Sequence, residues 1–334
     1  AGLGPGMVTA RLVRGMGSVL FALLMLGGAI WAGLAVDVQL VPPLRWLTWG
    51  VLAVVLVLGF VAWRKARPLG WIVLALAAGA VGLWYQTLVP RADRDWAPDV
   101  ARGVTARIRG DTVTLANIRD FRWSTPDQAE ERWISRSYDL NGLETVDMIT
   151  SVWANPAIAH LLVSFGFAGG EHVVFSAEIR REKDEKFNEI GGFFRQFELI
   201  LLAATEPDIV RLRTNVRKEE VSLFPVSLTP AQRREMFMAY VGLADRLELH
   251  PAFYNTITAN CTTVVWRLAR LLRPDLPIGR GLILSGYLPD YLNGLGLLEG
   301  DGSLAARRAA AKIDTRAQAA SEADFSTAIR TPDH

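Results

Sequence analysis

The sequence is poor in the residues and motifs that build disulfides, metal sites and cofactor sites. Its 334 residues include one cysteine, Cys261, and four histidines. A single cysteine cannot form a disulfide within its own chain. The metal-binding spacings HExxH and CxxC do not occur, so we expect no metal. Phosphate-binding loops and GxGxxG are absent as well, so we expect no cofactor, and the lack of GxSxG argues against a serine hydrolase of that class.

Charge of either sign is also close to balanced. The chain has 36 basic and 34 acidic residues, for a net charge of +2. Such a small excess gives no reason to expect nucleic acid as a partner. The length is sufficient for one membrane module and one globular domain. Residues 1–6 precede Met7, and we interpret them as a remnant of cloning that has no part in the fold.

Charged residues are absent from three long apolar runs, 15–36, 46–63 and 69–90. A helix needs about 20 apolar residues to cross a bilayer. The alternative interpretation is a cleaved signal peptide followed by buried core helices. The apolar part of a signal peptide is only about 7–15 residues long and would not be followed by two more such runs. We therefore expect a membrane domain over residues 7–90 with three transmembrane helices.

The charges that flank these runs predict their orientation. The loop between the first and second runs has only two charged residues, Asp37 and Arg45. The N-terminal flank and the other loop are basic, with Arg11, Arg14, Arg64, Lys65 and Arg67. Basic flanks favour the cytoplasmic side. We expect a multi-pass protein of the bacterial inner membrane, with its N-terminus in the cytoplasm and residues 91–334 in the periplasm.

The remaining residues predict an α+β domain. Short strand-like runs at 104–108 and 112–118 are separated by Gly110-Asp111, which is typical of a hairpin turn. Further strand-like runs cover 197–203 and 221–226. Helices are predicted from Pro230 to about Leu249, after the N-cap Thr229, and from Cys261 to the residues before Pro274. A domain with central strands and surrounding helices belongs to the α+β class.

A second predicted hairpin contains two of the histidines. Residues 160–167 and 172–178 alternate between apolar and polar side chains on either side of Gly169-Gly170. A two-residue loop would place His160 and Glu178 on opposite faces of the hairpin. A three-residue loop over 168–170 would place them opposite each other on one face. We predict the three-residue loop, or a bulge with the same effect.

Cys261 is the candidate nucleophile. Asn260 is a good N-cap, which puts Cys261 at the first position of its helix. There the helix dipole and nearby backbone N–H groups favour the thiolate and could hold an oxyanion beside the sulfur. Asn260 and Thr262 would then support the site. The competing interpretation is a buried structural cysteine, which behaves as a small apolar residue.

A thiolate nucleophile needs a base, and the base needs an acceptor that orients it. His250 precedes a proline and is expected to close a helix, and His334 is terminal. His160 and His172 remain, although each could be an ordinary polar strand residue. Glu178 or Ser176 could orient the base. The charged run 180–186 is most simply a solvated loop, but Arg180 or Arg181 could also bind a phosphate headgroup.

Several separated motifs resemble one family. They are Ala159-His-Leu-Leu-Val-Ser-Phe-Gly-Phe167, Ser176-Ala-Glu-Ile-Arg-Arg-Glu182, Phe194-Arg-Gln-Phe-Glu-Leu199 and Phe253-Tyr-Asn-Thr-Ile-Thr-Ala-Asn-Cys-Thr-Thr263. In this order they resemble the Lnb-type lipoprotein N-acyltransferases over roughly residues 100–334. More distantly, a strand histidine followed by a later Asn-Cys resembles the circularly permuted NlpC/P60 thiol enzymes, a papain-like fold.

The resemblance implies roles for the site residues. It makes Cys261 the nucleophile and His160 the base, and it favours Glu178 over His172 as the third member. Ser176 and Tyr254 would join Asn260 and Thr262 in support. One departure is Leu161, where the family often has a polar residue. We expect a periplasmic thiol-enzyme domain over residues 91–334.

The resemblance also implies a reaction. An acyl chain would pass from a membrane phospholipid to Cys261, and then to the N-terminal amine of a diacylated lipoprotein. The lipid bilayer is therefore an expected partner. Two alternatives stay open at this point. One is a thiol hydrolase, either a cell-wall amidase or a phospholipase, and the other is a membrane scaffold without catalysis.

Overall fold

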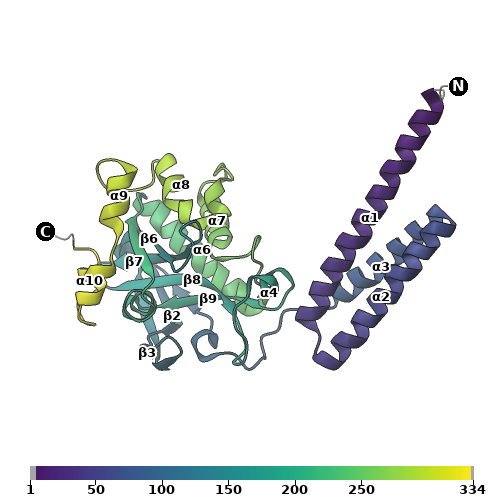
Figure 1. Ribbon diagram of the computed structural model, residues 1–334. Coiled ribbons are helices and arrows are strands. Elements are labelled where there is room, and N and C mark those ends of the chain that lie inside the picture. Colours follow the sequence, from purple (N-terminus) through teal and green to yellow (C-terminus); the bar gives the residue numbers. More distant parts are fainter. Residues whose placement is uncertain (1–4, 332–334) are drawn as a thin grey trace. The chain divides into compact units, whose positions relative to one another are not determined.

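The computed structural model describes residues 5–331 (Figure 1). Residues 1–4 of the interpreted cloning remnant and His334 lie outside this range. The chain forms two compact units. The membrane unit consists of the residues up to Pro90 together with Asn188–Gln196, and the globular unit consists of Arg91–Phe187 and the residues from Phe197 onward. Each unit is described by itself below.

Three long apolar helices make up most of the membrane unit. They are α1 (Pro5–Gln39), α2 (Pro42–Lys65) and α3 (Arg67–Gln86). The parts long and apolar enough to cross a bilayer are Gly15–Gln39, Pro42–Lys65 and Arg67–Gln86. The described residues therefore hold three candidate spans, in the part of the chain where three were expected. Pro42 starts α2 earlier than the apolar pattern suggested, because proline suits the first turn of a helix.

The third span ends at Gln86 and not at residue 90 as predicted. An arginine from far along the chain contacts this end of the helix. The Arg195 guanidinium donates hydrogen bonds to the carbonyl oxygens of Tyr85, at 2.8 Å, and of Leu88, at 3.1 Å. Carbonyls at a helix C-terminus lack partners inside the helix, so a cationic donor there stabilises the end.

The segment Asn188–Gln196 therefore packs within the membrane unit. It contains the short helix α4 (Glu189–Phe193), which Asn188 caps. The Gln39 amide donates to the Phe194 carbonyl oxygen at 2.6 Å, and the Trp31 and Phe194 rings lie 5.6 Å apart. The chain thus returns to the membrane helices between two strands of the globular unit.

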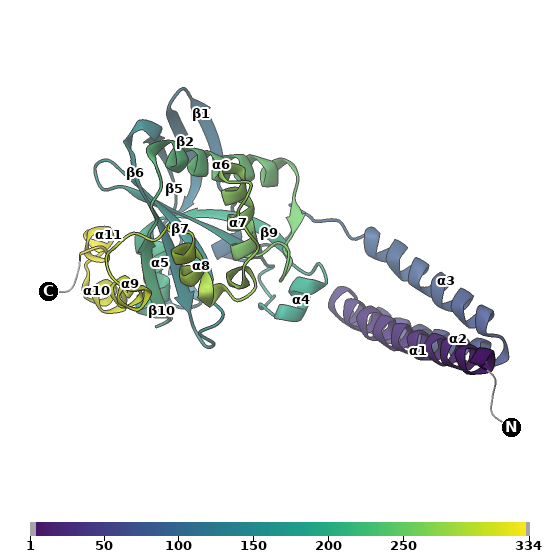
Figure 2. The same ribbon diagram turned by 90° about the horizontal axis from the view of Figure 1, so that it is seen from above.

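The globular unit is built on a nine-stranded sheet (Figure 2). The order is β1-β2-β9-β8-β7-β6-β10, with β5 on β2 and β11 on β9. All neighbouring pairs are antiparallel except β2 and β9. The strands are β1 (Thr105–Arg109), β2 (Thr112–Arg119), β5 (Trp133–Asp139), β6 (Leu143–Val152), β7 (His160–Phe167), β8 (His172–Arg180), β9 (Glu198–Ala204), β10 (Glu220–Pro225) and β11 (Ala252–Phe253). A separate pair, β3 (Arg122–Thr125) and β4 (Gln128–Glu130), forms a small second sheet.

Helices cover both faces of the large sheet. On one face, α6 (Pro230–Leu249) and α7 (Cys261–Leu272) pack on the odd-numbered residues of β7 and β8, such as Phe165 and Phe175. On the other, α5 (Glu206–Arg211), α10 (Asp314–Ala319) and α11 (Phe325–Ala328) pack on even-numbered ones, such as Leu162. Two further helices are α8 (Leu288–Gly294) and α9 (Leu304–Ala311). The α+β class is as predicted.

The hairpin of β7 and β8 has the predicted three-residue loop. Its pairs run from Gly166↔His172 to Val163↔Phe175. The Phe167 N–H donates to the Glu171 carbonyl oxygen at 2.8 Å, which leaves residues 168–170 as the loop. Gly169 and Gly170 have φ values of +90° and +82°, which glycine adopts without strain. Continuing this register puts His160 opposite Glu178.

Candidate active site

Cys261 is the first residue of α7, as the capping pattern predicted. The residue is partly buried, and its thiol lies beside the His160 side chain and the Leu161 backbone N–H, both of which act on its ionisation. Leu161 lies in the stretch of β7 beyond the last β7–β8 pair, where the two strands separate. The sulfur therefore lies at the end of the hairpin away from its loop, beside His160.

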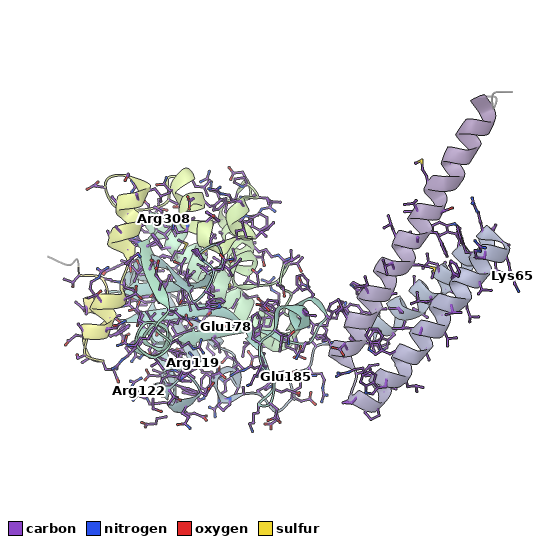
Figure 3. The ribbon with its side chains drawn as sticks, in the orientation of Figure 1. Lys65, Arg119, Arg122, Glu178, Glu185 and Arg308 are labelled. Carbon is purple, nitrogen blue, oxygen red and sulfur yellow. The ribbon has the colours of Figure 1, made fainter. Side chains whose placement is uncertain are left out.

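The His160 imidazole is held by two residues of β8. Its Nε2 lies 2.8 Å from the Ser176 hydroxyl oxygen and 2.9 Å from Glu178 Oε1. The Ser176 hydroxyl donates to the same carboxylate oxygen at 2.7 Å. Because Nε2 faces Glu178 and Ser176, Nδ1 is the ring nitrogen left for the thiol. Glu178 lies within the central sheet of the globular unit (Figure 3).

These contacts favour the charged form of all three groups. Burial disfavours the His160 imidazolium, but Glu178 and Cys261 outweigh it and raise the pKa of His160 to about 9. Burial also opposes ionisation of Cys261, yet the neighbouring His160 holds the pKa of the thiol below its ordinary value. The pKa of Glu178 is likewise lowered, against burial, by His160 and Arg213. The arrangement supports a thiolate–imidazolium pair.

Residues 129–285 match the family model described as the Lnb N-terminal periplasmic domain. These residues belong to that family. No curated protein and no solved structure gives a significant match to the chain. The Lnb domain so defined includes His160, Glu178 and Cys261. With the three apolar helices, it indicates a membrane protein with a periplasmic domain, and the family points to an enzyme of lipoprotein maturation.

The first turn of α7 differs from the expectation in one respect. Asn260 Oδ1 accepts hydrogen bonds from the Thr262 and Thr263 N–H groups at 3.0 and 2.9 Å. These two donors are therefore occupied by the cap and are not available to an oxyanion. Thr262 is buried within the Lnb domain. Asn260 and Thr262 support the site by fixing the helix start, and the N–H that does contact the sulfur comes from Leu161.

The other expected support residue lies in the core. Tyr254 is partly buried against the cluster beneath α6 and α7, and its N–H donates to the Phe197 carbonyl oxygen at 3.0 Å. It thereby anchors the loop that leads to Cys261.

The remaining histidines of the Lnb domain lie in other places. His172 Nδ1 is 3.0 Å from the Gly170 carbonyl oxygen and 4.0 Å from Glu206. His250 caps the C-terminus of α6. Of the two candidates for the third member of the site, the geometry thus brings Glu178 to His160 and leaves His172 at the opposite end of the hairpin.

Arg180 and Arg181 have partners inside the globular unit. Arg180 donates to the carbonyl oxygens of Val100, at 3.2 Å, and Ala101, at 2.6 Å, and its guanidinium lies over the Trp96 ring. Arg181 pairs with Asp99 at 2.8 Å. These contacts account for both arginines within the fold and lend the predicted headgroup role no support.

Sequence reasoning missed a buried ion network behind the histidine. Arg213, on the turn of π-helix Leu212–Val216, lies 3.4 Å from Glu178 Oε1 and 3.3 Å from Glu219 Oε2. The Ser151 hydroxyl donates to the same Glu219 oxygen. Nothing in the local pattern around Arg213 distinguishes it from a surface arginine.

Tyr240 is a second residue that sequence reasoning missed. It is buried on α6, where its ring stacks on Phe175, and its hydroxyl has no hydrogen-bond partner among the described residues. Burial and the nearby Cys261 charge raise its pKa, so it stays neutral beside the thiolate. Within residues 5–331, no cluster of three or more histidine, cysteine or acidic residues could hold a metal ion.

Proposed function

We propose that this protein is a lipoprotein N-acyltransferase that works through a thioester on Cys261. The observation that carries the proposal is the series Cys261–His160–Glu178, in which His160 lies beside the thiol and 2.9 Å from the carboxylate, in an Lnb domain whose chain also has three candidate membrane spans. A nucleophile, a base and an orienting carboxylate within hydrogen-bond reach are what acyl transfer by a thiol requires. A permuted NlpC/P60 relationship is part of this proposal.

In the first half-reaction, the Cys261 thiolate attacks the ester carbonyl carbon of a membrane phospholipid. A C–S bond forms and the ester C–O bond breaks. The His160 imidazolium gives its proton to the departing lysophospholipid oxygen. The Leu161 N–H, which already contacts the sulfur, and the N–H of Cys261 itself would stabilise the oxyanion. The products are an acyl thioester and lysophospholipid.

In the second half-reaction, the free α-amine of a diacylated lipoprotein attacks the thioester carbonyl. An amide C–N bond forms, the C–S bond breaks, and His160 takes the proton that the amine loses. The thiolate is restored. An amide is more stable than a thioester, so this step runs downhill. Both substrates are lipids, so anchoring the enzyme in the bilayer raises their effective concentration.

The test is a reconstitution of the full chain in liposomes with a diacylated lipopeptide. We expect intact-mass detection of one acyl group on Cys261 and of a third acyl chain on the lipopeptide. Cys261→Ala should abolish both products. His160→Ala should slow them by about 10²–10⁴-fold, the usual contribution of a general acid–base group. Transfer by the Cys261→Ala protein at the parent rate would contradict the proposal.

The acceptor distinguishes this proposal from a thiol hydrolase. A hydrolase would use water and release free fatty acid whether or not the lipopeptide amine is present. We expect instead that fatty acid release is slow and that blocking the lipopeptide amine by acetylation leaves the acyl group on Cys261. A scaffold would give neither product.

A further inference from the structure

An exposed apolar surface lies next to the site and has no role in the chemistry above. It consists of four large side chains, Ile158, Ile283, Leu284 and Tyr287, which we call the lip. Their exposed fractions are 39%, 72%, 38% and 36%. Single exposed apolar residues are common on any protein, but several that lie together mark a binding surface.

Backbone contacts join the two segments of the lip. The Gly286 N–H donates to the Ala157 carbonyl oxygen at 3.0 Å, and the Ala159 N–H donates to the Ser285 hydroxyl at 2.7 Å. A Cβ on Gly286 would overlap the carbonyl oxygen of Pro156, so only glycine allows this close approach. Ile158 and Leu284 are each one residue away from these contacts. The lip is therefore one surface built from two distant segments.

The lip is also continuous with the site. Ala159 is followed directly by His160. Tyr287 is followed by Leu288, which belongs to the same apolar cluster as Leu161 and Cys261. Arg308 donates to the Gly286 carbonyl oxygen at 3.2 Å and also pairs with Asp290, and these contacts brace the segment. An apolar chain on the lip would thus extend toward the sulfur.

A cation accompanies the apolar side chains. The Arg280 guanidinium lies 4.7 Å from the centre of the Tyr287 ring, and its side chain is 69% exposed. Its acidic neighbour Asp290 is 3.9 Å away and is shared with Arg308. A guanidinium with donors facing solvent, fixed over an aromatic ring, suits a phosphate group.

We infer that the lip binds a membrane phospholipid, with an acyl chain on the apolar side chains and the phosphate on Arg280. This inference rests on the proposed function, for which it defines the acyl-donor site. A diacylated lipoprotein also carries acyl chains, but its diacylglyceryl group has no phosphate for Arg280. The membrane spans of the same chain place the protein in a bilayer of such lipids.

The first experiment tests the lip without any chemistry. In the full chain with Cys261→Ser, a single cysteine is introduced by Ile283→Cys and labelled with an environment-sensitive fluorophore. The matched control is Ile108→Cys on β1, an isoleucine that is 50% exposed. In phosphatidylglycerol proteoliposomes with doxyl-labelled lipid, we expect a blue shift and quenching at position 283 and neither at position 108. Equal quenching at both positions, or none at 283, would overturn the inference.

The second experiment compares two acyl donors on the full chain. Ile283→Ser with Leu284→Ser, and separately Arg280→Gln, should slow acylation of Cys261 from phospholipid bilayers by tenfold or more. Acylation by water-soluble p-nitrophenyl acetate should change by less than twofold. The control is Arg102→Gln. The Arg102 guanidinium lies 5.6 Å from the centre of the Trp133 ring, and neither residue belongs to the lip. An equal loss with both donors would overturn the inference.

The two experiments also separate the inference from the proposed function. If the parent protein never acquires an acyl group from phospholipid, the proposed function fails. The fluorescence experiment still tests, independently of that outcome, whether the lip binds phospholipid.

Discussion

At the scale of single residues, the ionisation of Cys261 follows from its neighbours. His160 lowers the pKa of the thiol and burial raises it. Alkylation of Cys261 by iodoacetamide should therefore rise with pH at a midpoint below that of an ordinary thiol. In His160→Ala the lowering contact is gone and burial remains, so the midpoint should move to higher pH. The measurement is the alkylation rate against pH by mass spectrometry. An unchanged midpoint in His160→Ala would falsify the ion pair.

The Cys261–His160 pair also sets an upper pH limit for acylation. The pKa of His160 is raised from its ordinary value to about 9. The stabilisation that imidazolium gains in the fold is therefore complete below about pH 6.5 and is lost as the pH rises through about 9. Acylation from an ester needs the His160 proton for the leaving group. We expect its rate to fall above about pH 9 while alkylation, which needs only thiolate, stays on its plateau.

Glu178→Gln should change the pH dependence of Cys261 alkylation and also that of acylation. Without the carboxylate, burial and Arg213 disfavour imidazolium and only Cys261 still favours it, so the pKa of His160 should fall from its raised value. The upper limit of acylation should then move to lower pH, and the alkylation midpoint should move up. Ser176→Ala keeps the carboxylate and is the matched control, with a smaller shift in both. Identical profiles for Glu178→Gln and the parent would exclude an electrostatic role for Glu178.

The sequence allowed these residues to be found because each had a local signal. Asn-Cys marked a helix start, and the loop length of one hairpin decided which carboxylate faces His160. Arg213 had no such signal. Its position depends on a π-helical turn and on burial against Glu178 and Glu219, both of which result from tertiary packing.

At the scale of secondary-structure elements, the cap of α7 is the feature that places the sulfur. Asn260 Oδ1 accepts from two backbone N–H groups, and Asn260 Nδ2 donates to the Thr256 carbonyl oxygen at 2.7 Å. Asn260→Ala should lower the free energy of unfolding by about 1 kcal/mol. It should also slow alkylation of Cys261, because the first turn of the helix loosens.

Thr229→Ala is the matched control, because Thr229 caps α6 with a similar capping box. It should lower stability by a comparable amount and leave alkylation unchanged. Thermal unfolding followed by circular dichroism gives the stability, and mass spectrometry gives the alkylation rate. A slower thiol in both variants would mean that general loosening, and not the α7 cap, is responsible.

Several elements were predictable, whereas β5, β6 and the segment Asn188–Gln196 were not. The helix bounds of α6 and the strands β7 and β8 follow from apolar periodicity and capping residues. The segment Asn188–Gln196 has no long apolar run, so nothing in its sequence marks it as part of the membrane unit. Its place depends on Arg195 and Phe194 meeting the ends of α3 and α1, contacts between residues more than 100 positions apart.

At the scale of the whole molecule, the C-terminal tail closes the globular unit. Arg330 pairs with the buried Asp147 at 2.7 Å and the buried Glu206 at 2.6 Å, and Ser164 donates to Glu206 at 2.7 Å. This network joins the end of the chain to β6, β7 and α5, although Arg330 lies outside the matched residues 129–285.

Arg330→Ala would leave two buried carboxylates without their cation. We expect a loss of about 3–5 kcal/mol in the free energy of unfolding, the usual effect of breaking a buried ion pair. Arg316→Ala is the control, because within the described residues the Arg316 guanidinium donates to the backbone carbonyl oxygens of Thr331, Ala310 and Lys312. Denaturant unfolding measures both. Equal and small losses would show that the tail does not secure the fold.

The orientation in the membrane is the remaining property of the whole chain, and charge decides it. Asp37 and Arg45 pair across one loop, at 3.2 Å, whereas Arg64, Lys65 and Arg67 leave the other loop strongly basic. The basic loop should therefore stay in the cytoplasm and the globular unit should be periplasmic.

A labelling experiment tests this orientation. In Cys261→Ser, we introduce single cysteines by Ala66→Cys in the basic loop and Asp127→Cys in the β3–β4 turn, both exposed positions. A membrane-impermeant maleimide should label position 127 in intact spheroplasts and position 66 only after lysis. The reverse pattern would put the globular unit in the cytoplasm, away from the lipoproteins that the proposed reaction needs.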